Sequence, residues 1–143
     1  MSDIQLRPAT ADDQAAIRQL VRAEGLDPTA LHWSHFLIAE CEGEMVGIGQ
    51  VRPYPNCREL GSLAVKASYR QQGVGALIVN ALLARETGEV YLECVAANER
   101  YYTRFGFQRI PWWQAPMPLK LKAGLSQIVR LLGYRVVTMR RKV

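Results

Sequence analysis

The sequence predicts a mixed α/β domain with a central sheet flanked by helices. Apolar residues alternate along several short segments, which is typical of strands, and recur every three or four residues along others, which is typical of amphipathic helices. These two kinds of segment follow one another along the 143 residues, with no internal repeat and no linker between them. We therefore expect a single domain over residues 1–143.

Composition narrows the class of protein. Hydrophobic residues make up 49% of the chain and charged residues 22%, which favours a globular domain over a disordered one. No apolar run approaches the roughly 18 residues that would span a bilayer. The three cysteines include no C-x-x-C pair, a pattern that predicts a reducing, cytoplasmic location.

Charge is distributed unevenly along the chain. Residues 1–99 carry 13 acidic and 8 basic side chains, whereas residues 100–143 carry 10 basic and no acidic ones. Such a basic segment fits an anionic partner (a membrane, a nucleic acid or a phosphorylated ligand), and it fits equally a solvated rim of the domain. Both interpretations stay open at this point.

The first half of the chain is expected to contain three strands and one long helix. Thr10 or Asp12 can cap this helix, which runs through Arg22 and stops at Gly25. A short second helix or a turn is expected over residues 27–31, because proline favours a first helical turn. The strands are predicted at residues 4–7, 36–41 and 45–51, and a turn over residues 42–44 joins the last two.

The second half alternates more regularly. A helix over residues 76–87 is expected to end at a C-terminal cap, Gly88, and a short helix over residues 98–105 is expected to stop at Gly106. A further helix is expected within residues 112–134. The strands are predicted at residues 59–65, 90–95, 107–110 and 135–139.

Two glycines stand where the 59–65 strand gives way to the helix, in Arg70-Gln71-Gln72-Gly73-Val74-Gly75. The first amides of a helix lack intrahelical partners and attract anions, and glycines let the backbone approach such a ligand closely. The segment lacks the lysine of a P-loop and the third glycine of a dinucleotide fingerprint. The spacing therefore predicts an anion site and leaves the ligand open.

Two motifs resemble the GCN5-related N-acetyltransferases, the GNAT superfamily. "LGSLAVKASYRQQGVGALIVNALL" is similar to motif A of that family, and "YYTRFGFQRI" is similar to the end of its motif B. The opening "IQLRPATADDQAAIRQLV" also resembles the first strand and helix of the family, so the resemblance covers about residues 4–110. It implies the GNAT fold, a mixed sheet splayed at the motif A strand, with residues 112–143 as a variable segment completing the acceptor side.

The resemblance also implies acetyl-CoA as co-substrate and no metal. Backbone groups of the motif A strand would bind the pantetheine arm, and the amides after Arg70 would surround the diphosphate. Asn98 stands only four residues before Tyr102, where the family has a longer spacing, so its contact with the cofactor is the least supported. The expected cofactor residues are Leu63, Ala64, Val65, Arg70, Gln71, Gln72, Gly73, Val74, Gly75, Ala76 and Asn98.

Direct transfer of an acetyl group to an amine needs a proton acceptor and a proton donor. Tyr102 occupies the motif B tyrosine position and is expected to protonate the leaving thiolate. Glu59, at the start of the motif A strand, is the first candidate for the base, with Glu93 on the next strand as its competitor. Cys94 is expected to be a buried strand residue, since direct transfer needs no nucleophilic cysteine.

The motifs do not identify the acceptor, which could be a small-molecule amine or a protein amino group, nor decide between a monomer and a homodimer. Nucleic acid is not expected, because no helix-turn-helix arrangement or stacking aromatic surface is apparent. Two alternatives remain. One is a sensor that binds acetyl-CoA without transfer. The other is a binder of an anionic surface through the basic C-terminal segment.

Overall fold

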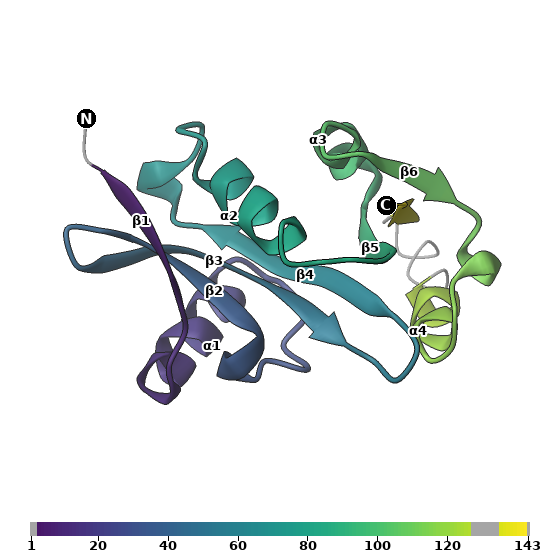
Figure 1. Cartoon of the computed structure of the whole chain (residues 1–143), viewed down its shortest axis with the longest axis horizontal. Helices are drawn as coiled ribbons and strands as arrows, with labels where there is room; N and C mark the ends of the chain where they lie inside the picture. Colours follow the sequence, from purple (N-terminus) through teal and green to yellow (C-terminus); the bar gives the residue numbers. More distant parts are fainter. Residues whose placement is uncertain (1–2, 127–134, 143) are drawn as a thin grey trace. The chain divides into compact units, whose positions relative to one another are not determined.

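The computed structural model describes residues 3–126 and 135–142, and these form an α/β fold (Figure 1). The strands are β1 (Ile4–Pro8), β2 (Phe36–Cys41), β3 (Glu44–Pro53), β4 (Arg58–Val65), β5 (Val90–Val95), β6 (Phe107–Ile110) and β7 (Val136–Arg141). The α-helices are α1 (Gln14–Ala23), α2 (Val74–Leu83), α3 (Glu99–Thr103) and α4 (Leu119–Ser126).

The chain divides into two compact units, each described here by itself: residues 1–52 with 60–85, and residues 53–59 with 86–143. Strand β4 contributes to both. Over the described ranges the seven strands are hydrogen-bonded in the order β1-β2-β3-β4-β5-β7-β6. β4 runs parallel to β5, and β5 and β6 each run antiparallel to β7. The predicted α/β class and mixed sheet are confirmed.

In the first unit, α1 and α2 cover opposite faces of the sheet (Figure 1). Successive side chains of a strand point to opposite faces. Ile48 of β3 belongs to the buried cluster that includes Ile17 and Leu20 of α1. Its neighbours Gly47 and Gly49 face α2, where a Cβ would lie 3.0 Å and 2.7 Å from side-chain atoms of Ile78. The glycines therefore let α2 lie close against β3.

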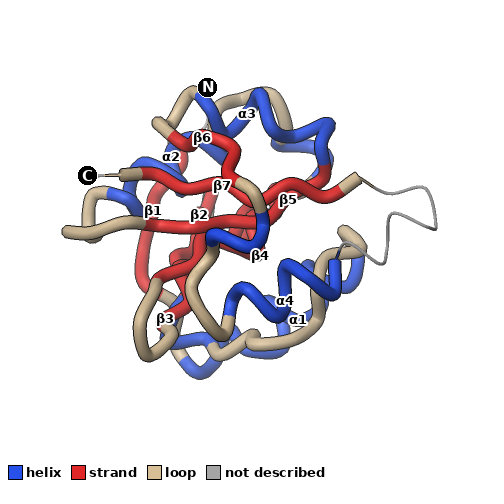
Figure 2. Tube along the Cα trace, turned by 90° about the vertical axis from the view of Figure 1, so that its right-hand side faces the viewer, coloured by secondary structure: helices blue, strands red, loops and turns tan. Residues whose placement is uncertain are grey.

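In the second unit, β7 lies between β5 and β6 (Figure 2). A small buried cluster of this unit joins Tyr91 of β5 to Ile110 of β6 and Leu119 of α4, together with Cys57 and Ala115. Glu59 at the start of β4 pairs in parallel with Tyr91. The predicted splay of β4 from β5 beyond this pair involves both units and stays a prediction.

Local signals placed most elements correctly and failed at some of the ends. Helix α2 ends at Leu83 with Ala84 as its C-cap, so the prediction of Gly88 as the cap was wrong. The hairpin turn comprises two residues, Glu42 and Gly43, both with positive φ, since β3 already begins at Glu44.

The short helix expected over residues 27–31 is a turn, in which the Thr29 amide donates to Asp27 Oδ1 at 2.9 Å. The helix expected within residues 112–134 is confirmed as α4, Leu119–Ser126. Its expected continuation over residues 127–134 lies outside the described residues.

Adding a methyl group at Gly49 tests the close packing of α2. Gly49→Ala should lower the free energy of unfolding by about 1–3 kcal/mol, because the new Cβ would overlap Ile78. Gly88→Ala is the control, because nothing lies within 4 Å of a Cβ there, and it should change stability by less than about 0.5 kcal/mol. Urea unfolding measures both, and equal effects would contradict the packing argument.

Candidate functional site

The loop between β4 and α2 has the backbone geometry of an anion site. Gln71 and Gly73 are left-handed, with φ of 62° and 83°, and Gly73 is the N-cap of α2. The first helical hydrogen bond runs from the Leu77 amide to the Gly73 carbonyl at 3.0 Å. The amides of the first helical turn, residues 74–76, therefore have no acceptor within the helix. Nothing lies within 4 Å of the position of a Gly73 Cβ.

Arg70 ties this loop to the rest of the first unit. Its Nε donates to the Val65 carbonyl at 3.2 Å, and its guanidinium forms an ion pair with Glu24 at the end of α1. The carboxylate partly neutralises the charge of Arg70. We infer that the backbone amides are the main donors to an anion here and that Arg70 shapes the loop. Residues 63–65 and 70–76 lie in the same unit.

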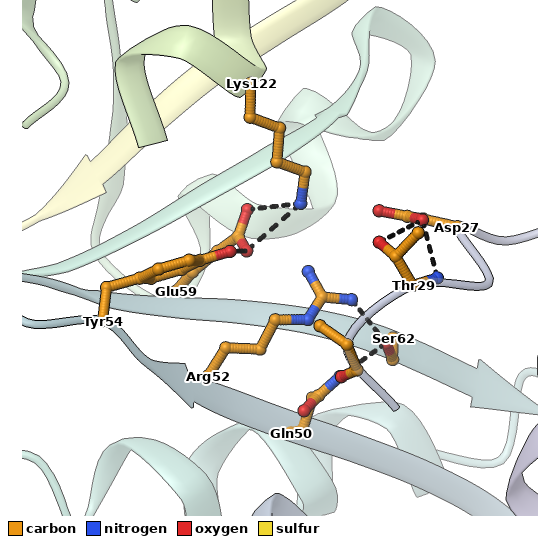
Figure 3. A network of polar contacts seen from close by, with 9 residues as sticks. Asp27, Thr29, Gln50, Arg52, Tyr54, Glu59, Ser62 and Lys122 are labelled. Carbon is orange, nitrogen blue, oxygen red and sulfur yellow. Dashed lines mark hydrogen bonds and ion pairs between the residues drawn. The ribbon is translucent and has the colours of Figure 1, made fainter. Parts of the chain in front are cut away.

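A polar cluster in the first unit surrounds Ser62 of β4, just before the residues expected to bind the cofactor. Ser62 has φ of 54° within the strand, and its hydroxyl accepts hydrogen bonds from Gln50 Nε2 at 2.9 Å and Arg52 Nη2 at 2.8 Å (Figure 3). Gln50 and Arg52 are 0% and 5% exposed. Sequence reasoning missed them, although they continue the core-facing alternation of Val46 and Ile48 with two polar residues.

In the second unit, Tyr102 lies on α3 with its ring packed edge-on against Phe107 and Tyr101, at 6.3 Å and 5.2 Å between ring centroids. Burial raises the pKa of the Tyr102 phenol well above its ordinary value, and Cys94 and Tyr101 raise it further. The group is therefore neutral at physiological pH and carries a proton that it can donate. Tyr101 packs against Phe105 and under Arg104, which fits a structural role.

Cys94 and Asn98 lie just before this aromatic group in the sequence. Burial raises the pKa of the Cys94 thiol to about 11, with Glu99 adding to the rise, so the sulfur stays protonated and is a poor nucleophile. Asn98 is the N-cap residue of α3 and is exposed, and its side chain makes no capping hydrogen bond. Glu93, the competing candidate for the base, lies on β5 in register with Thr138 of β7.

Glu59 is enclosed in a network of the second unit (Figure 3). The residue is 1% exposed. Lys122 Nζ of α4 donates to both carboxylate oxygens, at 3.2 Å and 3.1 Å, and the Tyr54 hydroxyl donates to Oε1 at 3.1 Å. Sequence reasoning missed Lys122 because 63 residues separate it from Glu59. Only the folded chain brings this lysine to the start of β4.

The residues that the structure describes contain neither a cluster of metal-binding side chains nor a helix that could span a membrane. Over residues 3–126 and 135–142, no three side chains of His, Cys, Asp or Glu gather as they would around a metal ion. The helices in those ranges are also too short or too polar to cross a membrane.

Several solved structures share this fold at low sequence identity. N-acetylglutamate synthase from Neisseria gonorrhoeae, complexed with coenzyme A and N-acetyl-glutamate, matches with a TM-score of 0.78 and 18% identity. The match covers 99% of this chain and 35% of that one, so this chain spans about a third of that enzyme.

Two other matches are closer to this chain in length. Rv2747 from Mycobacterium tuberculosis, in complex with CoA, has a TM-score of 0.76 and 19% identity, over 97% of this chain and 99% of that one. Diaminobutyrate acetyltransferase EctA from Paenibacillus lautus, in complex with diaminobutyric acid and coenzyme A, has a TM-score of 0.64 and 19% identity. The match covers 77% of this chain and 81% of that one.

No curated protein matches the sequence. Residues 32–109, more than half of the chain, match the acetyltransferase (GNAT) domain family. This range contains the glycine loop, Glu59 and Tyr102, and it agrees with the resemblance of the two motifs. The chain belongs to the GNAT acetyltransferase family.

Proposed function

We propose that the protein transfers an acetyl group from acetyl-CoA to the primary amine of a small molecule. The observation that carries the proposal is the loop after β4, in which left-handed Gly73 starts α2 and leaves three amides without helical acceptors. Such an arrangement suits a diphosphate. Structures of similar fold from other organisms contain CoA, which supports the same ligand for this chain.

In the proposed reaction the deprotonated amine attacks the thioester carbonyl carbon. A carbon–nitrogen bond forms and the carbon–sulfur bond breaks. Before the attack, the ammonium proton leaves through water to Glu59. The departing thiolate takes a proton from Tyr102, and the excess proton left on the nitrogen after the attack passes to the Tyr102 phenolate, which gives the neutral amide and restores the phenol. The Glu59 carboxylate accepts from Lys122 and Tyr54, and its oxygens have further lone pairs for a water molecule. Cys94 takes no part, because its pKa is raised to about 11.

The simplest test is a coupled assay in which a thiol reagent detects free CoA while acetyl-CoA is offered with a panel of amines. Small amino acids and diamines form the first arm of the panel, and a lysine-containing peptide forms the second. We expect amine-dependent release of CoA in the first arm. Binding of acetyl-CoA without release for any amine would favour the sensor alternative.

The anion site is tested by two variants of equal size at Gly73. Asn and Asp both tolerate the left-handed conformation, so the pair isolates charge from backbone strain. Gly73→Asp should weaken acetyl-CoA binding at least about tenfold more than Gly73→Asn, because it sets a carboxylate against the diphosphate. Calorimetry at low and high salt measures the difference, which should shrink as salt screens the charge. Equal affinities of the two variants would remove the diphosphate from this loop.

Deleting the hydroxyl of Tyr102 tests the proton donor. Tyr102→Phe should lower turnover at least about tenfold and leave the acetyl-CoA affinity nearly unchanged. Because burial raises the pKa of this phenol, wild-type turnover should not fall through its ionisation as the pH rises to about 10. Tyr101→Phe is the control. A similar loss in both variants would indicate damaged packing, and no loss in Tyr102→Phe would show that solvent protonates the thiolate.

Variants of Glu59 and Lys122 distinguish a catalytic role of the Glu59 carboxylate from a role in holding α4 in place. Glu59→Gln should lower turnover at least about tenfold if the carboxylate takes up the proton. Lys122→Met should mainly lower stability, since it leaves a buried carboxylate without its cation. The loss should fall below the roughly 3–5 kcal/mol of a fully buried pair, because the Lys122 side chain is 34% exposed. Thermal unfolding of both variants is measured in parallel with turnover. Equal losses of turnover in Glu59→Gln and Lys122→Met would show that Glu59 only holds α4 in place.

A further inference from the structure

A hollow of about 370 Å³ lies beside α1 in the first unit, apart from the loop that precedes α2. Its lining is Arg18, Arg22, Gly25, Leu26, Pro28 and Leu31. The volume lies at the lower end of the range of small-molecule sites, about 300–1,000 Å³. Two guanidinium groups line it together with three apolar side chains, a combination suited to a molecule with an anionic head and an apolar body.

The two arginines are placed unfavourably unless an anion joins them. They lie four residues apart on one face of α1, and like charges at this spacing destabilise a helix. Helix α1 contains no acidic residue, and Asp13 just before it is held by Arg7 at 2.8 Å. Across residues 3–126 and 135–142, neither Arg18 nor Arg22 forms an ion pair or a side-chain hydrogen bond. An anion held by both would relieve their repulsion.

Hydrogen bonds fix the loop that contributes Leu31 to the lining. Gln14 donates to the Leu31 carbonyl, and Gln50 Nε2 donates to the Ala30 carbonyl at 3.1 Å, so the loop is held from the core side. Ala30 keeps a φ of 56° in this arrangement. Leu31 is 9% exposed and, with Leu26, belongs to the core cluster beneath the hollow.

Three carbonyls of the last turn of α1 already accept hydrogen bonds from the backbone that follows the helix. The Leu20 carbonyl accepts from the Glu24 amide at 3.0 Å, the Arg22 carbonyl from Gly25 at 3.2 Å, and the Val21 carbonyl from Leu26 at 3.0 Å. The nearby carboxylates are also occupied. Glu24 binds Arg70, and Asp27 Oδ1 accepts from the amide and hydroxyl of Thr29.

We propose that this hollow binds an amphiphilic organic anion, a carboxylate on a short aliphatic chain. Arg18 and Arg22 would bind the carboxylate, and the apolar lining residues Leu26, Pro28 and Leu31 would contact the aliphatic chain. The site is separate from the proposed acetyl-CoA loop, and its existence does not depend on the proposed reaction. Glu24 connects the two regions, since it follows α1 directly and pairs with Arg70 of the loop.

The test uses octanoate as the probe and the full chain saturated with CoA. The bound CoA prevents octanoate from occupying the proposed cofactor site. Acetate supplies the head without the tail, and 1-octanol supplies the tail without the charge. Amide chemical shifts in two-dimensional NMR report where each probe binds. We expect octanoate to shift the signals of Gly25, Leu26 and Leu31, with an affinity at least about tenfold above that of either control.

Arg18→Gln and Arg22→Gln should each weaken octanoate binding at least about tenfold, and the double variant should abolish the saturable shifts. Arg85→Gln changes an exposed arginine of the same unit that does not line the hollow, so it is the matched control and should change nothing. Octanoate binding that survives the double variant, or acetate binding as tightly as octanoate, would overturn the proposal. Thermal unfolding of each variant checks that the fold persists.

Discussion

The close approach of α2 to β3 is the constraint on which the proposed cofactor loop depends. Gly47 and Gly49 leave room for Ile78, so the axis of α2 can lie near the sheet directly after β4 ends. The chain must then reverse within a few residues, and left-handed Gln71 and Gly73 accomplish this. Bulkier residues at 47 and 49 would collide with Ile78 and push α2 away from β3.

Polar side chains in the core shape the two ends of β4 separately. In the first unit, Ser62 takes hydrogen bonds from Gln50 and Arg52 and adopts a left-handed conformation within a strand. In the second unit, Glu59 is held by Lys122 and Tyr54. Buried polar groups are costly unless they are hydrogen-bonded, so each network limits the positions that its strand can take.

Partial burial raises the pKa of two titratable groups near α3, Tyr102 and Cys94. The pKa of Tyr102 is raised by burial, which keeps a proton on the phenol, and the pKa of Cys94 is raised to about 11, which keeps the thiol unreactive. Both properties are compatible with the proposed direct transfer, which needs a protonated phenol and no nucleophilic thiol. The hollow beside α1 differs from this region, because it combines two exposed arginines with apolar lining residues.

The sequence by itself determined the α/β class, most strands and the loop at Gly73, because these follow from local periodicity and glycine placement. It failed where helices end without a strong stop, as at Leu83, and where a turn has two residues instead of three. Only the tertiary structure decided that Lys122 binds Glu59, that Arg70 pairs with Glu24, and that Arg18 and Arg22 line a hollow. These contacts join or combine residues from different elements, and their energies come from burial and distance in space, which no short stretch of sequence records.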